Sequence, residues 1–91
     1  MQEAFKMTVE ERLVIPGVPD VILAGPVTRG ICKAGDRLEL KGESGVRLAS
    51  CLGVELINWG RGRDAWVSIR VSDVGLDDVS EITQVDGRRP S

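Results

Sequence analysis

The sequence predicts an all-β fold: a single, closed, six-stranded antiparallel barrel with Greek-key-like connections. Its 91 residues are enough for one domain built around one core. Several segments alternate between apolar and polar residues with a period of two, which is typical of strands with one buried face. Eleven glycines and four prolines punctuate these segments, and one Phe and two Trp leave Val, Leu and Ile to form the core.

The longest alternating segment covers residues 4–15 and predicts a long first strand. Glu11 interrupts its apolar face, so the strand either bends near a rim at this residue or contributes it to a site. The apolar residues of that face are Phe5, Met7, Val9, Leu13 and Ile15.

Five further strands follow, separated by glycine-rich turns. Pro26 requires an edge or a bulge, because proline cannot donate a ladder hydrogen bond. Gly53 indicates a bulge or a strong bend inside a strand whose even positions, from Val46 to Leu56, are mostly apolar. Gly30 and Gly35 mark two tight turns, residues 42–45 a hairpin loop, and residues 74–81 at most one helical turn. The expected strands are residues 4–15, 21–27, 37–41, 46–57, 66–71 and 82–85; the whole chain, 1–91, is one domain with its core at about 4–86 and a polar tail at 87–91.

Charge and residue usage argue against several functions. A net charge of −2 speaks against broad, charge-driven binding of nucleic acids. The absence of histidine removes the commonest general base and metal ligand, and we expect no metal, no cofactor and no enzymatic activity. Cys32 and Cys51 lack a metal-site spacing and are expected to be buried, reduced thiols of a cytoplasmic protein. We expect no membrane span and no secretory signal.

Four motifs in register resemble domain 2 of elongation factor Tu, the β-barrel of the translational GTPases. They are F-K-M-T-V-E-E at residues 5–11, I-P-G at 15–17, V-T-R-G-I-C-K-A-G-D-R-L-E-L at 27–40 and C-L-G-V-E-L at 51–56. The similarity covers roughly residues 4–86. It implies a translation factor domain 2-like barrel, which in that family sits beside a GTPase domain and helps to hold the aminoacylated 3′ end of transfer RNA.

The chain carries no G-x-x-x-x-G-K-[ST] phosphate loop, so no bound GTP is expected. The resemblance places the family's acidic pair at Glu10 and Glu11, and the glutamate that borders the terminal adenosine at Glu55. Other positions of the family's pocket have changed, which argues that the fold has been kept and the transfer RNA function has not. These departures are Leu13 for an aromatic residue, Ala24 for a threonine, Pro26 for a basic residue, Ala65 for an asparagine and Trp66 for a small aliphatic residue.

Two groups of side chains are candidates for a binding site. Glu10, Glu11 and Glu55 converge as an acid–base or hydroxyl-binding cluster, or else they are surface charge on an inherited scaffold. The turn W-G-R-G-R-D-A-W at residues 59–66 allows three interpretations: a tip that stacks and grips unpaired bases, a protein contact, or a purely structural hairpin. Its candidate residues are Trp59, Arg61, Arg63 and Trp66.

The sequence therefore favours a non-catalytic binding module over a small enzyme. The first hypothesis is docking on a protein partner: a translation factor, a ribosomal component or a second copy of the chain. The alternative is an RNA-binding module that contacts a transfer RNA 3′ end or ribosomal RNA.

Overall fold

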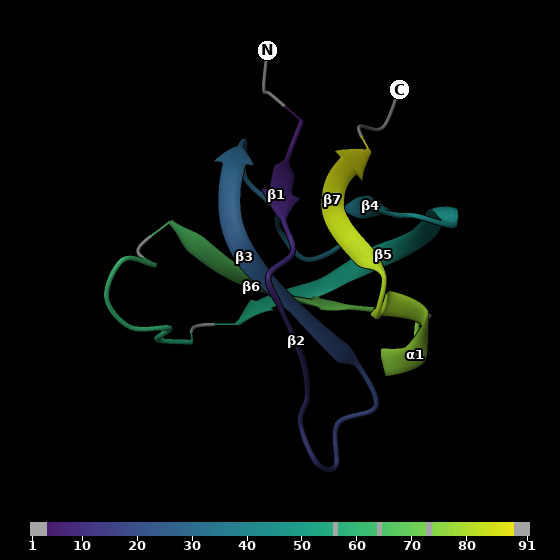
Figure 1. Ribbon diagram of the computed structural model, residues 1–91, viewed down its shortest axis with the longest axis horizontal. Coiled ribbons are helices and arrows are strands. Elements are labelled where there is room, and N and C mark those ends of the chain that lie inside the picture. Colours follow the sequence, from purple (N-terminus) through teal and green to yellow (C-terminus); the bar gives the residue numbers. More distant parts are fainter. Residues whose placement is uncertain (1–3, 56, 64, 73, 89–91) are drawn as a thin grey trace.

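The computed structural model describes residues 4–55, 57–63, 65–72 and 74–88. These residues form strands and one short helix (Figure 1). In chain order the elements are β1 (Lys6–Thr8), β2 (Glu11–Val14), β3 (Val21–Arg29), β4 (Arg37–Gly42), β5 (Gly45–Glu55), β6 (Trp66–Val71), α1 (Leu76–Val79) and β7 (Ile82–Arg88).

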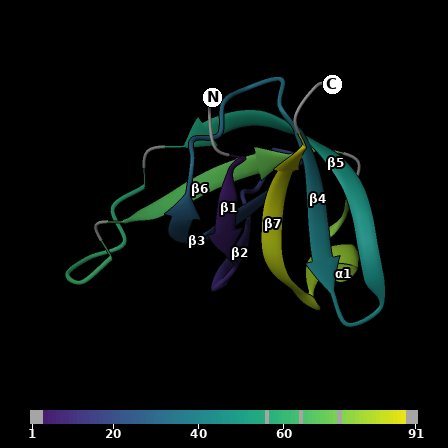
Figure 2. The same cartoon turned by 90° about the horizontal axis from the view of Figure 1, so that it is seen from above.

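Six of the strands close into an antiparallel barrel, as the sequence predicts. Their order around the barrel is β1, β7, β4, β5, β6 and β3, and the pairing of β1 with β3 completes the ring. The remaining strand, β2, pairs with β3 alone among the described strands. Because β7 lies between β1 and β4, and β3 lies beside β6, the connections join strands distant in sequence, as a Greek-key arrangement requires (Figure 2).

The predicted first strand is present but bends between β1 and β2. The Val9 amide donates to the Thr83 carbonyl at 2.9 Å, and the Glu10 amide donates to the Ala24 carbonyl at 2.8 Å, so the chain changes partner at this point. The bend brings the Thr8 backbone against Gly25 of β3, where a Cβ atom would lie 1.8 Å from the Thr8 carbonyl oxygen. Glu11 follows directly as the first residue of β2, which confirms the interpretation of this carboxylate as the mark of a bend.

The core fills the barrel and draws on every strand except β2. Leu38 of β4 faces Ala49 of β5 across the ladder, and such pairing of large and small side chains lets opposite walls interdigitate. Cys32 and Cys51 belong to this core and carry free thiols, as the sequence predicts. The fully buried side chains of the barrel core include Met7, Val21, Leu23, Leu38, Leu40, Ile69, Val71 and Val85.

A bulge in β5 reverses which side chains of that strand face inward. Cys51 pairs with Val71, but Gly53 pairs with Arg70, so Leu52 is an extra residue in the ladder. This confirms the bulge predicted at Gly53. Before the bulge the even-numbered residues point outward: Val46 is 57% and Leu48 56% exposed. The apolar alternation of β5 therefore predicts the strand but not its buried face, because Ala49 and Cys51 are the residues that line the interior.

Strand β3 is buried on both faces, in agreement with its nearly continuous apolar sequence. Val21 and Leu23 belong to the barrel core, whereas Ile22 and Ala24 are fully buried outside that cluster. Pro26 pairs with Trp66 of β6, and on the other edge of β3 it falls between the residues paired with β2 and those paired with β1. The predicted ladder irregularity at the proline is thus where β3 changes partner.

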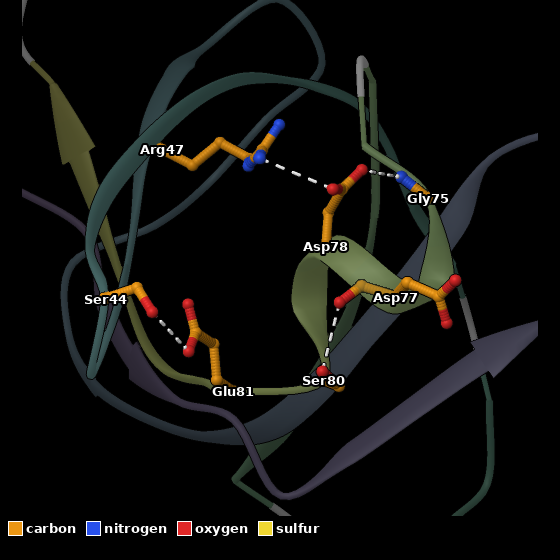
Figure 3. A network of polar contacts seen from close by, with 7 residues as sticks. All are labelled: Ser44, Arg47, Gly75, Asp77, Asp78, Ser80 and Glu81. Carbon is orange, nitrogen blue, oxygen red and sulfur yellow. Dashed lines mark hydrogen bonds and ion pairs between the residues drawn. The ribbon is translucent and has the colours of Figure 1, made fainter.

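One end of the barrel is covered by α1, whose Val79 side chain is buried in the core. The Arg12 guanidinium donates to the carbonyl oxygens of Val79, at 2.7 Å, and of Ile82. A polar network joins the β4–β5 hairpin to the same region (Figure 3). In it Arg47 pairs with Asp78 at 3.4 Å, the Ser44 hydroxyl donates to Glu81 at 2.8 Å, and the Gly75 amide donates to Asp78 at 2.8 Å. The single helical turn predicted at residues 74–81 is present as α1.

The closing strand is longer than the sequence predicts. β7 continues to Arg88, so residues 87 and 88 are not part of a polar tail, while residues 89–91 of that tail lie outside the described residues. Two contacts account for the extension: the Gly87 amide donates to the Phe5 carbonyl at 2.7 Å, and Lys41 forms an ion pair with Asp86 at 2.6 Å.

We predict that Gly25→Ala strongly destabilises the fold. The new methyl group would overlap backbone atoms of Thr8, which cannot move without separating β1 from β3. The expected loss is about 3 kcal/mol or more, the upper range for overpacking. Urea unfolding followed by circular dichroism measures it. The matched control is Gly53→Ala, whose Cβ would meet only the Arg70 side chain at 3.8 Å and should change stability by less than about 1 kcal/mol. Equal midpoints for the two variants would contradict this account of barrel closure.

We also predict that Asp86→Asn destabilises the protein in a pH-dependent way. Burial favours a higher pKa for Asp86, but hydrogen bonds from Lys41 and Gln84 outweigh it and hold the pKa below its ordinary value of 3.8. The same hydrogen bond to Asp86 raises the pKa of Lys41 above 10.5. The carboxylate therefore stabilises the folded state above pH 3.8 and loses this effect as the pH falls through its lower folded-state pKa. The ammonium contributes below pH 10.5 and loses its effect as the pH rises through its folded-state pKa.

The measurement is the urea midpoint of wild type and Asp86→Asn across this pH range. The variant should unfold at lower urea at neutral pH, and the difference should shrink well below pH 3.8. Glu43→Gln, which alters an exposed carboxylate in the β4–β5 turn, is the control. A difference for Asp86→Asn that is independent of pH would argue against the ion pair.

Candidate binding surface around Trp66

The turn between β5 and β6 projects beyond the barrel (Figures 1 and 2). Gly60 and Gly62 adopt φ angles of 92° and 78°, which allow the chain to reverse there. The Trp59 indole N–H donates to the Ser68 hydroxyl at 2.7 Å, and this hydroxyl belongs to a residue that is 2% exposed. Trp59 is therefore anchored to β6 rather than free in solution.

Trp66, the first residue of β6, is the centre of a cluster of side chains at this turn. The ring centroids of Trp59 and Trp66 lie 5.4 Å apart with their planes at 45°. The Arg63 guanidinium lies over the Trp66 ring, 4.5 Å from its centroid, in a cation–π contact. The structure thus brings together Trp59, Arg63 and Trp66 as a preformed aromatic–cationic group, while Arg61 is exposed on the same turn.

Two hollows meet at Trp66. The first, of about 390 Å³, lies at the open end of the barrel and has an apolar wall. We call it the mouth; it is lined by Phe5, Val27, Gly30, Ile31, Cys32, Val54, Ala65, Trp66 and Val67. The second, of about 370 Å³, lies beside the mouth and is lined by Val54, Glu55, Ile57, Asn58, Trp66, Val67 and Ser68.

The bulge at Leu52 determines what each hollow contains. Beyond it Val54 pairs with Ile69, an inward-facing residue of β6, so Val54 points into the mouth. Glu55 pairs with Ser68 and faces outward into the second hollow. The outward position lets Glu55 form an ion pair with Arg70 at 3.4 Å, and Arg70 also lies 3.7 Å from Asp20.

The three predicted carboxylates do not converge. Glu11, Ala24, Ser68 and Glu55 form one cross-strand row over β2, β3, β6 and β5. Glu11 and Glu55 are therefore about 14 Å apart, three strand spacings. Glu10 is exposed and precedes this row. Such a separation is too large for a shared acid–base pair, and the charge of Glu55 is already balanced by Arg70.

Sequence reasoning missed most of the mouth. The sequence predicts that Phe5, Val27 and Val67 lie on strands, but which end of the barrel stays open depends on tertiary structure. Ile31 is the clearest sequence signal for the mouth, because it is a large apolar residue within a glycine-bounded turn. In the structure its side chain is 84% exposed. The described residues contain no group of three or more His, Cys, Asp or Glu side chains that could hold a metal, and no helix among them is long and apolar enough to span a membrane.

The fold and these hollows define a small closed β-barrel with an apolar mouth flanked by an aromatic–cationic turn. No model of a known protein family matches the chain, and no curated protein is similar enough to count as a relative.

We predict that the Trp59–Ser68 hydrogen bond stabilises the turn. Trp59→Phe removes the donor and Ser68→Ala removes the acceptor, and each should lower stability. A double-mutant cycle isolates the bond itself, because the double variant loses it only once. The expected coupling is about 1 kcal/mol, the usual net value for a neutral hydrogen bond. Urea unfolding of the four proteins measures it, and strictly additive losses would show that the bond contributes nothing.

Proposed function

We propose that this protein is a non-catalytic binding module that docks on a protein partner through the mouth and Trp66. The observation that carries the proposal is the junction of two preformed hollows at a half-buried tryptophan. Apolar hollows with a few polar groups at the edge are typical of binding sites. Tryptophan and arginine are enriched among the residues that dominate the energetics of protein interfaces, and here Arg63 is already stacked on Trp66.

The polar groups around this surface favour recognition rather than catalysis. Glu55 is paired with Arg70, and Glu11 stands three strands away. The exposed Ile31 side chain adds apolar area at the edge of the mouth, which a protein partner would cover on docking. The resemblance to domain 2 of elongation factor Tu makes a translation factor, a ribosomal component or a second copy of the chain the partners to test first.

RNA is the alternative partner. The effect of changing Arg61 distinguishes binding of RNA from docking of a protein. Both Arg61 and Arg63 are exposed in this turn, and Arg63 also lies over the Trp66 ring. Binding to a transfer RNA 3′ end or to ribosomal RNA would use exposed cations and would weaken steeply with salt. Docking of a protein in the mouth would depend on Trp66 and Ile31 and would be little changed by loss of Arg61.

The test compares affinity purifications from native extract with wild-type protein and with the variants Trp66→Ala, Arg61→Ala and Val46→Ala. Sedimentation of the purified protein tests self-association. We expect Trp66→Ala to weaken the complex about 30-fold or more, the effect of losing roughly 2 kcal/mol at an interface hot spot. Val46 is an exposed apolar residue of β5 that lines neither hollow, so Val46→Ala should bind normally.

The proposal requires that binding survive nuclease treatment and the change Arg61→Ala. If the complex disappears with nuclease and weakens with Arg61→Ala, the surface binds RNA instead. If Trp66→Ala and Val46→Ala bind like wild type while unfolding cooperatively, the mouth is not the docking surface.

A further inference from the structure

The loop between β2 and β3 forms an exposed apolar projection. Residues 14–19 read V-I-P-G-V-P and carry no charged side chain, and we call them the knob. In Figure 1 the knob extends beyond the barrel, below every other part of the chain. Val14 is 50% and Ile15 41% exposed, and Pro16 and Pro19 are exposed as well. Apolar side chains gathered at an exposed tip are typical of an interaction site.

The knob is held in one conformation before it meets a partner. The Val18 amide donates to the Ile15 carbonyl at 2.9 Å, which closes a turn of four residues. Pro16 occupies the first central position of this turn, and Gly17 adopts a φ of 84° at the second, as a type II turn requires. The paired strands β2 and β3 lead away from the turn on either side. A preformed apolar tip loses little conformational entropy when it binds.

The mouth matches the knob in size and polarity. Its volume of about 390 Å³ lies near the lower end of the range for ligand pockets, about 300–1,000 Å³. A hollow of this size takes a few aliphatic side chains, and Ile15 and Pro16 are presented together at the tip of the knob. The wall of the mouth includes Phe5, Val27 and Ile31, so insertion would remove apolar surface from water on both sides.

The knob cannot enter the mouth of its own chain. The knob directly precedes β3, whereas Gly30 and Ile31 of the mouth directly follow it. A nine-residue strand spans roughly 25 Å, so β3 holds the two features apart. Figure 1 shows the knob below the start of β3 and the arrowhead that ends β3 near the top of the molecule. A knob therefore reaches only the mouth of another molecule.

The rim of the mouth is positively charged. Two of its cations flank residues 30–32 and two lie in the turn between β5 and β6; all are exposed, and none forms an ion pair within the part of the chain that the structure describes. Of the carboxylates nearby, Asp36 accepts a hydrogen bond from the Lys33 amide, Glu55 is paired with Arg70, and Asp64 lies outside the described residues. The four cations are Arg29, Lys33, Arg61 and Arg63.

The strands that carry the knob bring carboxylates with it. Glu10 is exposed, Glu11 begins β2, and Asp20 directly precedes β3, where it lies 3.7 Å from Arg70. Arg12, the only cation in residues 10–20, directs its guanidinium to carbonyl oxygens at the end of α1 and the start of β7. The charges around the knob and around the mouth are thus opposite in sign, which steers the encounter of the two surfaces.

We propose that the knob of one copy of this chain inserts into the mouth of a second copy, so that molecules associate head to tail. The inference rests on the proposed function, because it names the partner of the same mouth and of Trp66. Contact between two knobs or two mouths would instead bring like charges together, which is unfavourable. Since two different surfaces meet, each added copy leaves one knob and one mouth free. Copies therefore join into a row, or into a ring where the rotation between them closes.

Complementation between two variants tests this contact. Ile15→Ser removes the apolar tip of the knob and keeps the mouth, whereas Trp66→Ala alters the mouth and keeps the knob. Self-association of either variant should weaken about 30-fold or more, as at an interface hot spot, so each should be monomeric where wild type associates. An equimolar mixture should form a 1:1 dimer and nothing larger, because only one intact knob and one intact mouth are available to each pair.

Sedimentation velocity of the purified chain, at concentrations up to the millimolar range, measures these masses. Wild type should exceed the mass of a dimer as its concentration rises. Leu48→Ser is the matched control, since Leu48 is an exposed aliphatic residue of β5 that lines neither hollow at Trp66. This variant should associate like wild type. Circular dichroism confirms that all variants are folded.

Three outcomes would overturn the head-to-tail contact. One is wild-type protein that stays monomeric at every concentration. Another is association of folded Ile15→Ser at the level of wild type. The third is a mixture of the two variants that stays monomeric although wild type associates, which would mean that copies meet through some other pair of surfaces.

Failure of this contact and failure of the proposed function give different results. If wild type is monomeric but Trp66→Ala still loses a protein partner from native extract, the mouth binds a different protein and only the head-to-tail contact is wrong. If Trp66→Ala neither loses a partner nor changes self-association, the mouth is not a docking surface and both are wrong.

Discussion

Closure of the barrel depends on one close approach between two backbones. At Gly25 the main chain of β3 lies against the Thr8 carbonyl, and no side chain fits between them. This contact is where the N-terminal strand bends, leaves β7 and continues beside β3 as β2. Pairing of β1 with β3 completes the ring of strands that encloses the core.

The sequence predicts the strands well because their signals are local. Period-two alternation, glycine at turns and the bulge at Gly53 each depend on a few neighbouring residues. The buried face of β5 could not be predicted in the same way. A single extra residue, Leu52, shifts the register, and the interior accepts the small Ala49 and Cys51 because Leu38 and its neighbours already fill the barrel. The length of β7 likewise depends on partners distant in sequence, Phe5 and Lys41.

The candidate surface could likewise be predicted only where its signals are local in sequence. The aromatic and cationic residues of the β5–β6 turn could be identified because they are unusual in composition and close in sequence. The apolar mouth could not be identified, because its wall combines residues that are distant in sequence. They come from the segment before β1, from β3, β5 and β6, and from the turn after β3. The carboxylates show the reverse error: the sequence analysis treats Glu10, Glu11 and Glu55 as one possible group, yet Glu11 and Glu55 lie at opposite ends of a row that crosses four strands.

The two ends of the described chain lie on one side of the barrel, next to the mouth (Figure 1). Phe5 lines the mouth, and the Gly87 amide donates a hydrogen bond to the Phe5 carbonyl. A reporter protein or purification handle fused at either terminus would therefore be tethered beside the candidate surface and would compete for space there. The β4–β5 hairpin, where Gly42 pairs with Gly45, lies at the opposite end of the barrel. Attachment at the exposed Glu43 would leave the mouth accessible, which makes this hairpin the better site for immobilisation or labelling.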